Sequence, residues 1–143
     1  MNAELPPIAR AANRVLLDTE KAVIRFARRH KYQVGADLRS QAMEIARCAY
    51  RAWRERGRQL QRVHELAEAI DNLKLTMRLA KQLNAFGSFG EFVALAREVI
   101  ELWRQCGGWL KSLHAKGRNE SERAPDQRAL TLSSRGASNE ATL

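Results

Sequence analysis

Several residue types that mark particular classes of protein are scarce in this chain. Of its 143 residues two are cysteine and three are histidine, and neither type recurs at the spacing of a metal site. A disulfide framework and a zinc-binding module are therefore not indicated. The longest stretch without an ionisable residue, 82–90, is far shorter than the roughly 20 apolar residues that span a bilayer. No membrane partner is expected.

The start of the chain has no basic residues followed by an apolar run, so a secretion signal is not indicated. We therefore expect a cytoplasmic protein in which Cys48 and Cys106 are reduced thiols packed inside helices. With 45% hydrophobic residues and only three prolines, the chain fits one domain with a modest core.

Positive charge is abundant and unevenly placed. The chain holds 25 Lys and Arg against 16 Asp and Glu, a net charge of +9. Residues 21–62 contain twelve of these cations and only three of the acids, so the rest of the chain has thirteen of each. A concentrated positive field is typical of a surface that binds a polyanion, which favours nucleic-acid binding.

Apolar residues recur every three or four positions in four segments, which predicts four amphipathic helices near 8–26, 34–53, 60–83 and 88–110. Ser88 and Glu91 form a capping box at the start of the last one. Its predicted buried face is Phe92, Ala96, Val99, Trp103, Cys106 and Leu110, and that of the second is Val34, Leu38, Ala42, Ile45, Ala46, Ala49, Tyr50 and Trp53.

Short links between long amphipathic helices favour antiparallel neighbours, so the predicted fold is all-α, an up-and-down antiparallel four-helix bundle. Leu75, Leu79 and Leu83 lie away from the main apolar stripe of their helix, which indicates a second contact, between subunits. We expect the bundle domain to cover 1–115. Residues 116–143 lack the apolar pattern and are expected to form a disordered basic and polar tail.

Two rows of cations are candidates for binding nucleic acid or a partner. The first has spacings of four, three, four and four, so a helix running through Gly57 would place all five guanidinium groups on one face, where each could neutralise a phosphate; a break at Gly57 would splay the row. Its members are Arg47, Arg51, Arg54, Arg58 and Arg62. A solvated face offset by neighbouring glutamates is the alternative interpretation.

The second row, Lys74, Arg78 and Lys81, has apolar neighbours on its helix, as surfaces that meet a protein or a nucleic acid have. Pairing with Asp71 could absorb one of these charges. A third cluster, Arg28, Arg29 and Lys31, is predicted at the end of the first helix, where cations also stabilise the last carbonyl groups.

Catalysis is not supported by any grouping of residues. No glycine-rich phosphate loop follows a strand, and no arrangement of nucleophile, base and acid can be argued. Acids such as Asp18 and Glu20 are interpreted as surface groups on helices. The sequence predicts a protein that is not an enzyme and needs no cofactor.

Three stretches together resemble a family of bacterial four-helix-bundle proteins. Residues 26–35, Phe-Ala-Arg-Arg-His-Lys-Tyr-Gln-Val-Gly, are similar to its first helical junction, although Ala27 stands where the family usually has proline. Residues 73–80, Leu-Lys-Leu-Thr-Met-Arg-Leu-Ala, and 107–111, Gly-Gly-Trp-Leu-Lys, resemble motifs of one branch. That branch is the Avd type, the accessory variability determinant of diversity-generating retroelements, and the resemblance covers roughly residues 8–113.

The resemblance implies a barrel-shaped homopentamer, bacterial or phage-encoded, that associates with the retroelement reverse transcriptase and with template RNA, cDNA or their hybrid during mutagenic retrohoming. By this resemblance Lys74 and Arg78 contact the partner. Two other interpretations stay open: a ribosomal-RNA-associated bundle without a polymerase partner, and a purely structural helical oligomer whose charge serves solubility.

Overall fold

A computed structural model describes residues 5–123, with side chains as far as Asn119. All regular elements in this range are helical, which confirms the predicted all-α class. The helices are α1 (Pro7–Ile24), α2 (Arg28–Lys31), α3 (Val34–Arg54), the short 3-10 helix η2 (Arg56–Arg58), α4 (Gln59–Gln82) and α5 (Phe89–Arg123). The chain divides after Leu110 into two compact units, and the first unit carries the bundle.

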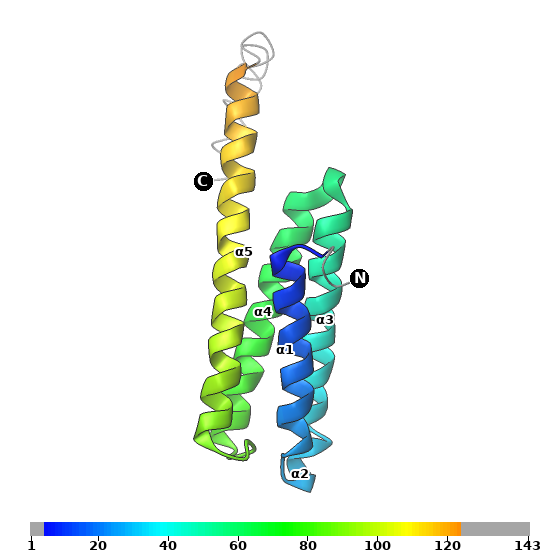
Figure 1. Cartoon of the computed structure of the whole chain (residues 1–143), viewed down its shortest axis with the longest axis vertical. Helices are drawn as coiled ribbons and strands as arrows, with labels where there is room; N and C mark the ends of the chain where they lie inside the picture. The colour runs from blue at the N-terminus through cyan, green and yellow to red at the C-terminus, as the bar shows by residue number, and fades with distance from the viewer. Residues whose placement is uncertain (1–4, 124–143) are drawn as a thin grey trace, which may run out of the picture. The chain divides into compact units, whose positions relative to one another are not determined.

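In the first unit the chain reverses direction between successive long helices (Figure 1). Helix α3 packs along both α1 and α4. Helix α5 lies against α4, where the Cys106 thiol donates a hydrogen bond to the carbonyl oxygen of Val63 at 3.7 Å. These contacts make a helical bundle with an up-and-down chain path, as the sequence predicts.

The core of the bundle consists of the apolar stripes that face one another. The buried stripe of α3 follows the predicted series except at Tyr50, which is half exposed, and Val15, Leu38 and Leu73 of α1, α3 and α4 are fully buried. In α5 the buried side chains are Leu95, Val99, Leu102 and Cys106. The predicted stripe was wrong for this helix at Trp103, which is 47% exposed. Leu95 and Leu102 turn inward instead, which rotates the buried face of α5 away from the predicted one.

The ends of the helices follow from local sequence. Pro7 occupies the first turn of α1, where a missing N–H costs no hydrogen bond. The Ser88 hydroxyl accepts a hydrogen bond from the Glu91 backbone N–H at 3.1 Å, which confirms Ser88 as the cap of α5. The Glu91 carboxylate forms an ion pair with Arg25 at the end of α1. The Ser88 half of the capping box is therefore present. The Glu91 carboxylate does not complete the box and instead ties α5 to α1.

Helix α5 extends to Arg123, beyond the predicted domain end at 115. The predicted tail is therefore helical over 116–123. The remainder of that prediction, 124–143, lies outside the described residues.

Candidate nucleic-acid and partner interface

The junction between α1 and α3 carries three of the predicted cations. Arg28, Arg29 and Lys31 form α2 with His30, after α1 has ended at Ile24. The prediction that they lie in the last turn of α1 is wrong, since the basic residue there is Lys21. Arg28 and Arg29 are exposed, and no carboxylate in residues 5–119 forms an ion pair with them.

The position of α2 is fixed by close packing on either side of it. A Cβ atom at Gly35 would lie 2.8 Å from Val23 Cγ1 and 3.1 Å from the carbonyl oxygen of His30, so the start of α3 touches both α1 and α2. The buried ring of Phe26 meets Phe86 edge to face at 5.0 Å between centroids. The cations of α2 therefore project from an anchored turn.

The arginine row on α3 is interrupted. Helix α3 ends at Arg54, and Glu55 has φ −95° and ψ 77°, outside the helical range. Arg58 precedes α4, and Arg62 lies within it. The five guanidinium groups therefore do not share one continuous helical face. The sequence predicts this result if the helix breaks near Gly57. Three members, Arg47, Arg51 and Arg54, remain together on α3.

Arg62 is held by carboxylates from both sides of the turn. Its guanidinium forms ion pairs with Glu55, before η2, and with Glu65 on α4 at 3.0 Å. These hydrogen bonds, that of Glu55 first, raise the pKa of Arg62. Its side chain is only 18% exposed. Arg62 closes the α3–α4 turn, and this engagement leaves it less free to meet a phosphate than the other members of the row.

The other arginines near this turn have more freedom. Arg47 pairs with Glu44 at 3.7 Å, yet 60% of its side chain is exposed. No ion pair joins Arg51, Arg54 or Arg58 to a carboxylate in the part of the chain with described side chains. With Arg56 of η2, which is exposed and has no ion pair either, four guanidinium groups thus stand on or next to the end of α3 without an opposite charge.

The second row, Lys74, Arg78 and Lys81, lies on α4 beside aromatic groups of α5. The Lys74 ammonium group is 4.5 Å from the centre of the Trp103 ring, and that of Lys81 is 5.2 Å from the Phe92 ring. Such cation–π contacts hold the ammonium groups at the surface without neutralising them. Lys74 and Arg78 also line an apolar groove of about 160 Å³ with Phe92 and Ile100.

The leucines that sequence reasoning placed on a spare face are indeed exposed. Leu75, Leu79 and Leu83 have 55%, 47% and 50% of their surface in solvent. They share one side of α4 because their spacing is four residues. Since large apolar side chains gathered on a surface mark contact sites, this stripe is a candidate interface.

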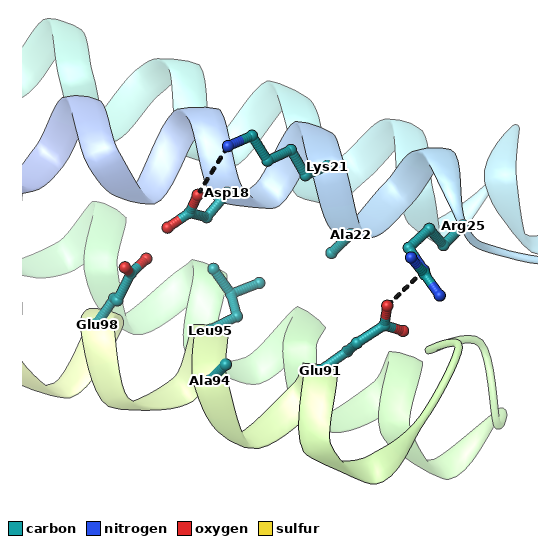
Figure 2. A pocket seen from close by; sticks show the side chains of 8 residues that line it. All are labelled: Asp18, Lys21, Ala22, Arg25, Glu91, Ala94, Leu95 and Glu98. Atoms are coloured by element: carbon teal, nitrogen blue, oxygen red, sulfur yellow. Dashed lines mark ion pairs between the residues drawn. The ribbon is translucent and has the colours of Figure 1, made fainter.

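A feature that sequence reasoning missed is a carboxyl pair between α1 and α5. Asp18 and Glu98 face each other in a groove of about 260 Å³ (Figure 2). Burial and then the hydrogen bond with Asp18 raise the pKa of Glu98 to about 7. The interpretation of Asp18 and Glu20 as plain surface acids is incomplete, because Glu20 also pairs with Arg39 of α3 at 2.6 Å. These pairs join helices that are far apart in the sequence. They could be identified only once the packing of α1 against α3 and α5 was known.

Both cysteines are buried and free, as predicted. Burial is the main cause that raises the pKa of each thiol to about 11, and for Cys48 the hydrogen bond with Glu44 adds to it. Since the thiolate is the reactive form, both groups are unreactive near neutral pH.

No group of three metal-ligating side chains occurs among the described residues. No helix in residues 5–123 combines the length and apolar character needed to cross a membrane. Comparisons with family models, with curated proteins and with solved structures find no match to this chain.

Proposed function

We propose that this chain is a non-enzymatic accessory protein of a diversity-generating retroelement, which holds the reverse transcriptase and nucleic acid together. The observation that carries the proposal is the presence of exposed cations without carboxylate partners at two places, on α2 and at the end of α3. Arg62 and Arg39 have carboxylate partners on neighbouring segments. At these two places the cations without a carboxylate partner are Arg28, Arg29, Arg51, Arg54, Arg56 and Arg58, of which Arg51 is half-buried and the others are exposed.

In this proposal the nucleic acid is bound through its phosphates. Each guanidinium group that contacts a phosphate releases counterions, so affinity is salt-dependent and carries no base preference of its own. Template RNA, cDNA and their hybrid all present this charge. The bundle supplies a rigid surface for the contact, with neither bond making nor bond breaking.

The polymerase is assigned to the α4 surface. Lys74, Arg78 and Lys81 lie between the exposed leucine stripe on their own helix and the aromatic rings of α5. Cations beside the apolar groove of Phe92 and Ile100 suit a protein partner better than a phosphate backbone, because a protein can also cover these apolar side chains. The leucine stripe, Leu75, Leu79 and Leu83, is assigned to contacts between subunits in a homopentameric ring.

A charge reversal tests the polymerase assignment. The double variant Lys74→Glu and Arg78→Glu should abolish co-elution with the reverse transcriptase of the proposed retroelement, while circular dichroism stays unchanged. The matched control is Arg10→Glu with Arg14→Glu, which makes the same charge change on the exposed side of α1 and should leave the complex intact. Survival of the complex in the first variant refutes the assignment.

Native mass spectrometry tests the assembly. The intact protein should give a pentamer, and Leu75→Gln with Leu79→Gln should give monomers that keep their helicity. A wild-type monomer contradicts the ring. Binding of RNA without any polymerase partner would instead favour the ribosomal-RNA-associated bundle, and absence of salt-dependent binding would favour a structural oligomer.

A further inference from the structure

One exposed tyrosine lies within the arginine row of α3. Sequence reasoning placed Tyr50 in the buried series, but half of its surface is in solvent. Arg47 precedes it by three residues and Arg54 follows it by four, so all three share one side of the helix. Arg51 is the next residue along the chain. The ring therefore lies on the side of α3 that carries Arg47 and Arg54, and Arg51 borders this side.

The Tyr50 ring is steadied without being covered. Trp53 meets it edge to face, with 5.8 Å between centroids and 70° between the planes. A contact of this geometry lets Trp53 cover at most one face of the tyrosine ring, and half of the residue is exposed. Trp53 itself is half-buried, which anchors the pair to the bundle.

The surrounding charge selects the kind of ligand. Arg51 and Arg54 have no carboxylate partner, and Arg47 has only a long contact with Glu44. From Arg47 to Arg54 the helix rises about 10 Å, so the guanidinium groups can reach successive phosphates of a strand that passes over the ring. An aromatic face next to unpaired guanidinium groups is what single-stranded nucleic acids bind, through base stacking and phosphate contacts.

We infer that this face of α3 binds single-stranded nucleic acid, with a base stacked on Tyr50 and phosphates held by Arg47, Arg51 and Arg54. The inference rests on the proposed nucleic-acid function and adds the strand state of the ligand. In a duplex the bases are paired and stacked, so only their phosphates are available and the tyrosine contributes nothing. A retroelement accessory protein with this surface holds RNA or cDNA while it is unpaired.

Fluorescence anisotropy with two labelled probes tests the inference. One probe is a single strand of about 15 nucleotides and the other is a hairpin duplex with the same number of phosphates. The wild-type protein should bind the single strand more tightly. Tyr50→Ala should weaken single-strand binding by roughly 5- to 100-fold, the equivalent of one stacked base, and leave duplex binding within about 2-fold.

Two variants control for structure. Tyr50→Phe keeps the ring and should keep the single-strand affinity, whereas Met43→Ala removes an exposed side chain from the same helix and should change neither affinity. Helicity by circular dichroism should be the same in all three.

Three results overturn the inference. In the first, Tyr50→Ala weakens both probes equally or neither. In the second, wild-type protein binds strand and duplex with the same affinity. In the third, Tyr50→Ala spares both probes but weakens the complex with the polymerase, which makes this face a protein contact. If wild-type protein binds neither probe at low salt, the proposed function itself fails, which is a distinguishable outcome.

Discussion

The end of α3 and the groove between α1 and α5 use charge in opposite ways. Around Tyr50, three guanidinium groups stand close together with few acids near them. In the groove, two carboxyl groups, Asp18 and Glu98, face each other, and Arg25 pairs with Glu91 about two turns away (Figure 2). Where a neighbouring helix supplies an opposite charge, a charged side chain holds the bundle together. Where it does not, the charge remains available to a ligand.

The largest expected effect comes from removing the unpaired charge. A triple variant of Arg51, Arg54 and Arg58 to Gln should weaken single-strand binding by about two orders of magnitude at 0.1 M salt, since three phosphate contacts contribute a salt slope of about −2. The matched control is a triple variant of Lys74, Arg78 and Lys81 to Gln, with the same change in net charge. This control variant should lower the nucleic-acid affinity much less. An equal loss of affinity in both triple variants would contradict the assignment of the two rows to different partners.

The carboxyl pair predicts a pH effect on stability. The pKa of Glu98 is raised from 4.5 to about 7 in the folded protein, so folding favours its protonated form. The stabilising contribution is complete below about pH 4.5 and is lost as the pH rises through about 7. Glu98→Gln mimics the protonated group. It should raise the Tm at pH 8 and change it little at pH 5.

Thermal denaturation of wild type and variant at these two pH values measures this effect. The control Glu101→Gln changes an exposed acid of the same helix that pairs only locally, with Arg104. A Tm difference between wild type and Glu98→Gln that is the same at both pH values would show that Glu98 does not titrate as described.

Paired and unpaired arginines at the α3–α4 turn can be compared directly. Arg62→Gln removes a guanidinium group that holds Glu55 and Glu65, so it should lower the Tm and leave nucleic-acid affinity nearly unchanged. Arg58→Gln removes an exposed group without a carboxylate partner. It should therefore lower the nucleic-acid affinity and leave the Tm nearly unchanged. Differential scanning calorimetry and anisotropy on the two variants separate these effects. If both variants change the Tm and the affinity in the same way, paired and unpaired arginines do not differ in role.

The smallest expected effect lies at the α1–α2 junction. Ala27 has φ −56° and ψ 145°, close to the backbone angles of proline. Ala27→Pro should therefore raise the free energy of unfolding by about 0.4–1 kcal/mol, because it restricts the unfolded chain. Chemical denaturation measures the change. Ala46→Pro, in the interior of α3, should destabilise the protein because it removes a helical hydrogen bond, and a loss of stability in Ala27→Pro would exclude a proline-compatible junction.

The sequence predicts the helices better than it predicts the site. Apolar periodicity placed the first three long helices within two residues of their ends, because each buries a continuous stripe. The buried face of α5 was less well predicted, since apolar residues occur on two sides of that helix and only packing decides between them. Whether the arginine row would continue past Gly57 was left open, because a single glycine is compatible with a helix as well as with a turn.

Pairwise contacts between distant segments were beyond the sequence. Sequence reasoning interpreted Asp18 as a surface acid, whereas it faces Glu98 from a helix eighty residues away. Arg62 shared the spacing of the other arginines, and only the fold of the turn gave it two carboxylate partners. Charge composition therefore identified the region that carries excess charge, while the fold determined which cations are free.

The dependence of affinity on salt tests the central claim most directly. For wild-type protein and a labelled single strand, the logarithm of the association constant should fall linearly with the logarithm of salt concentration, with a slope of about −2 or steeper. A slope near zero, or no binding at low salt, would contradict the account, because the exposed arginines would then not be holding phosphates.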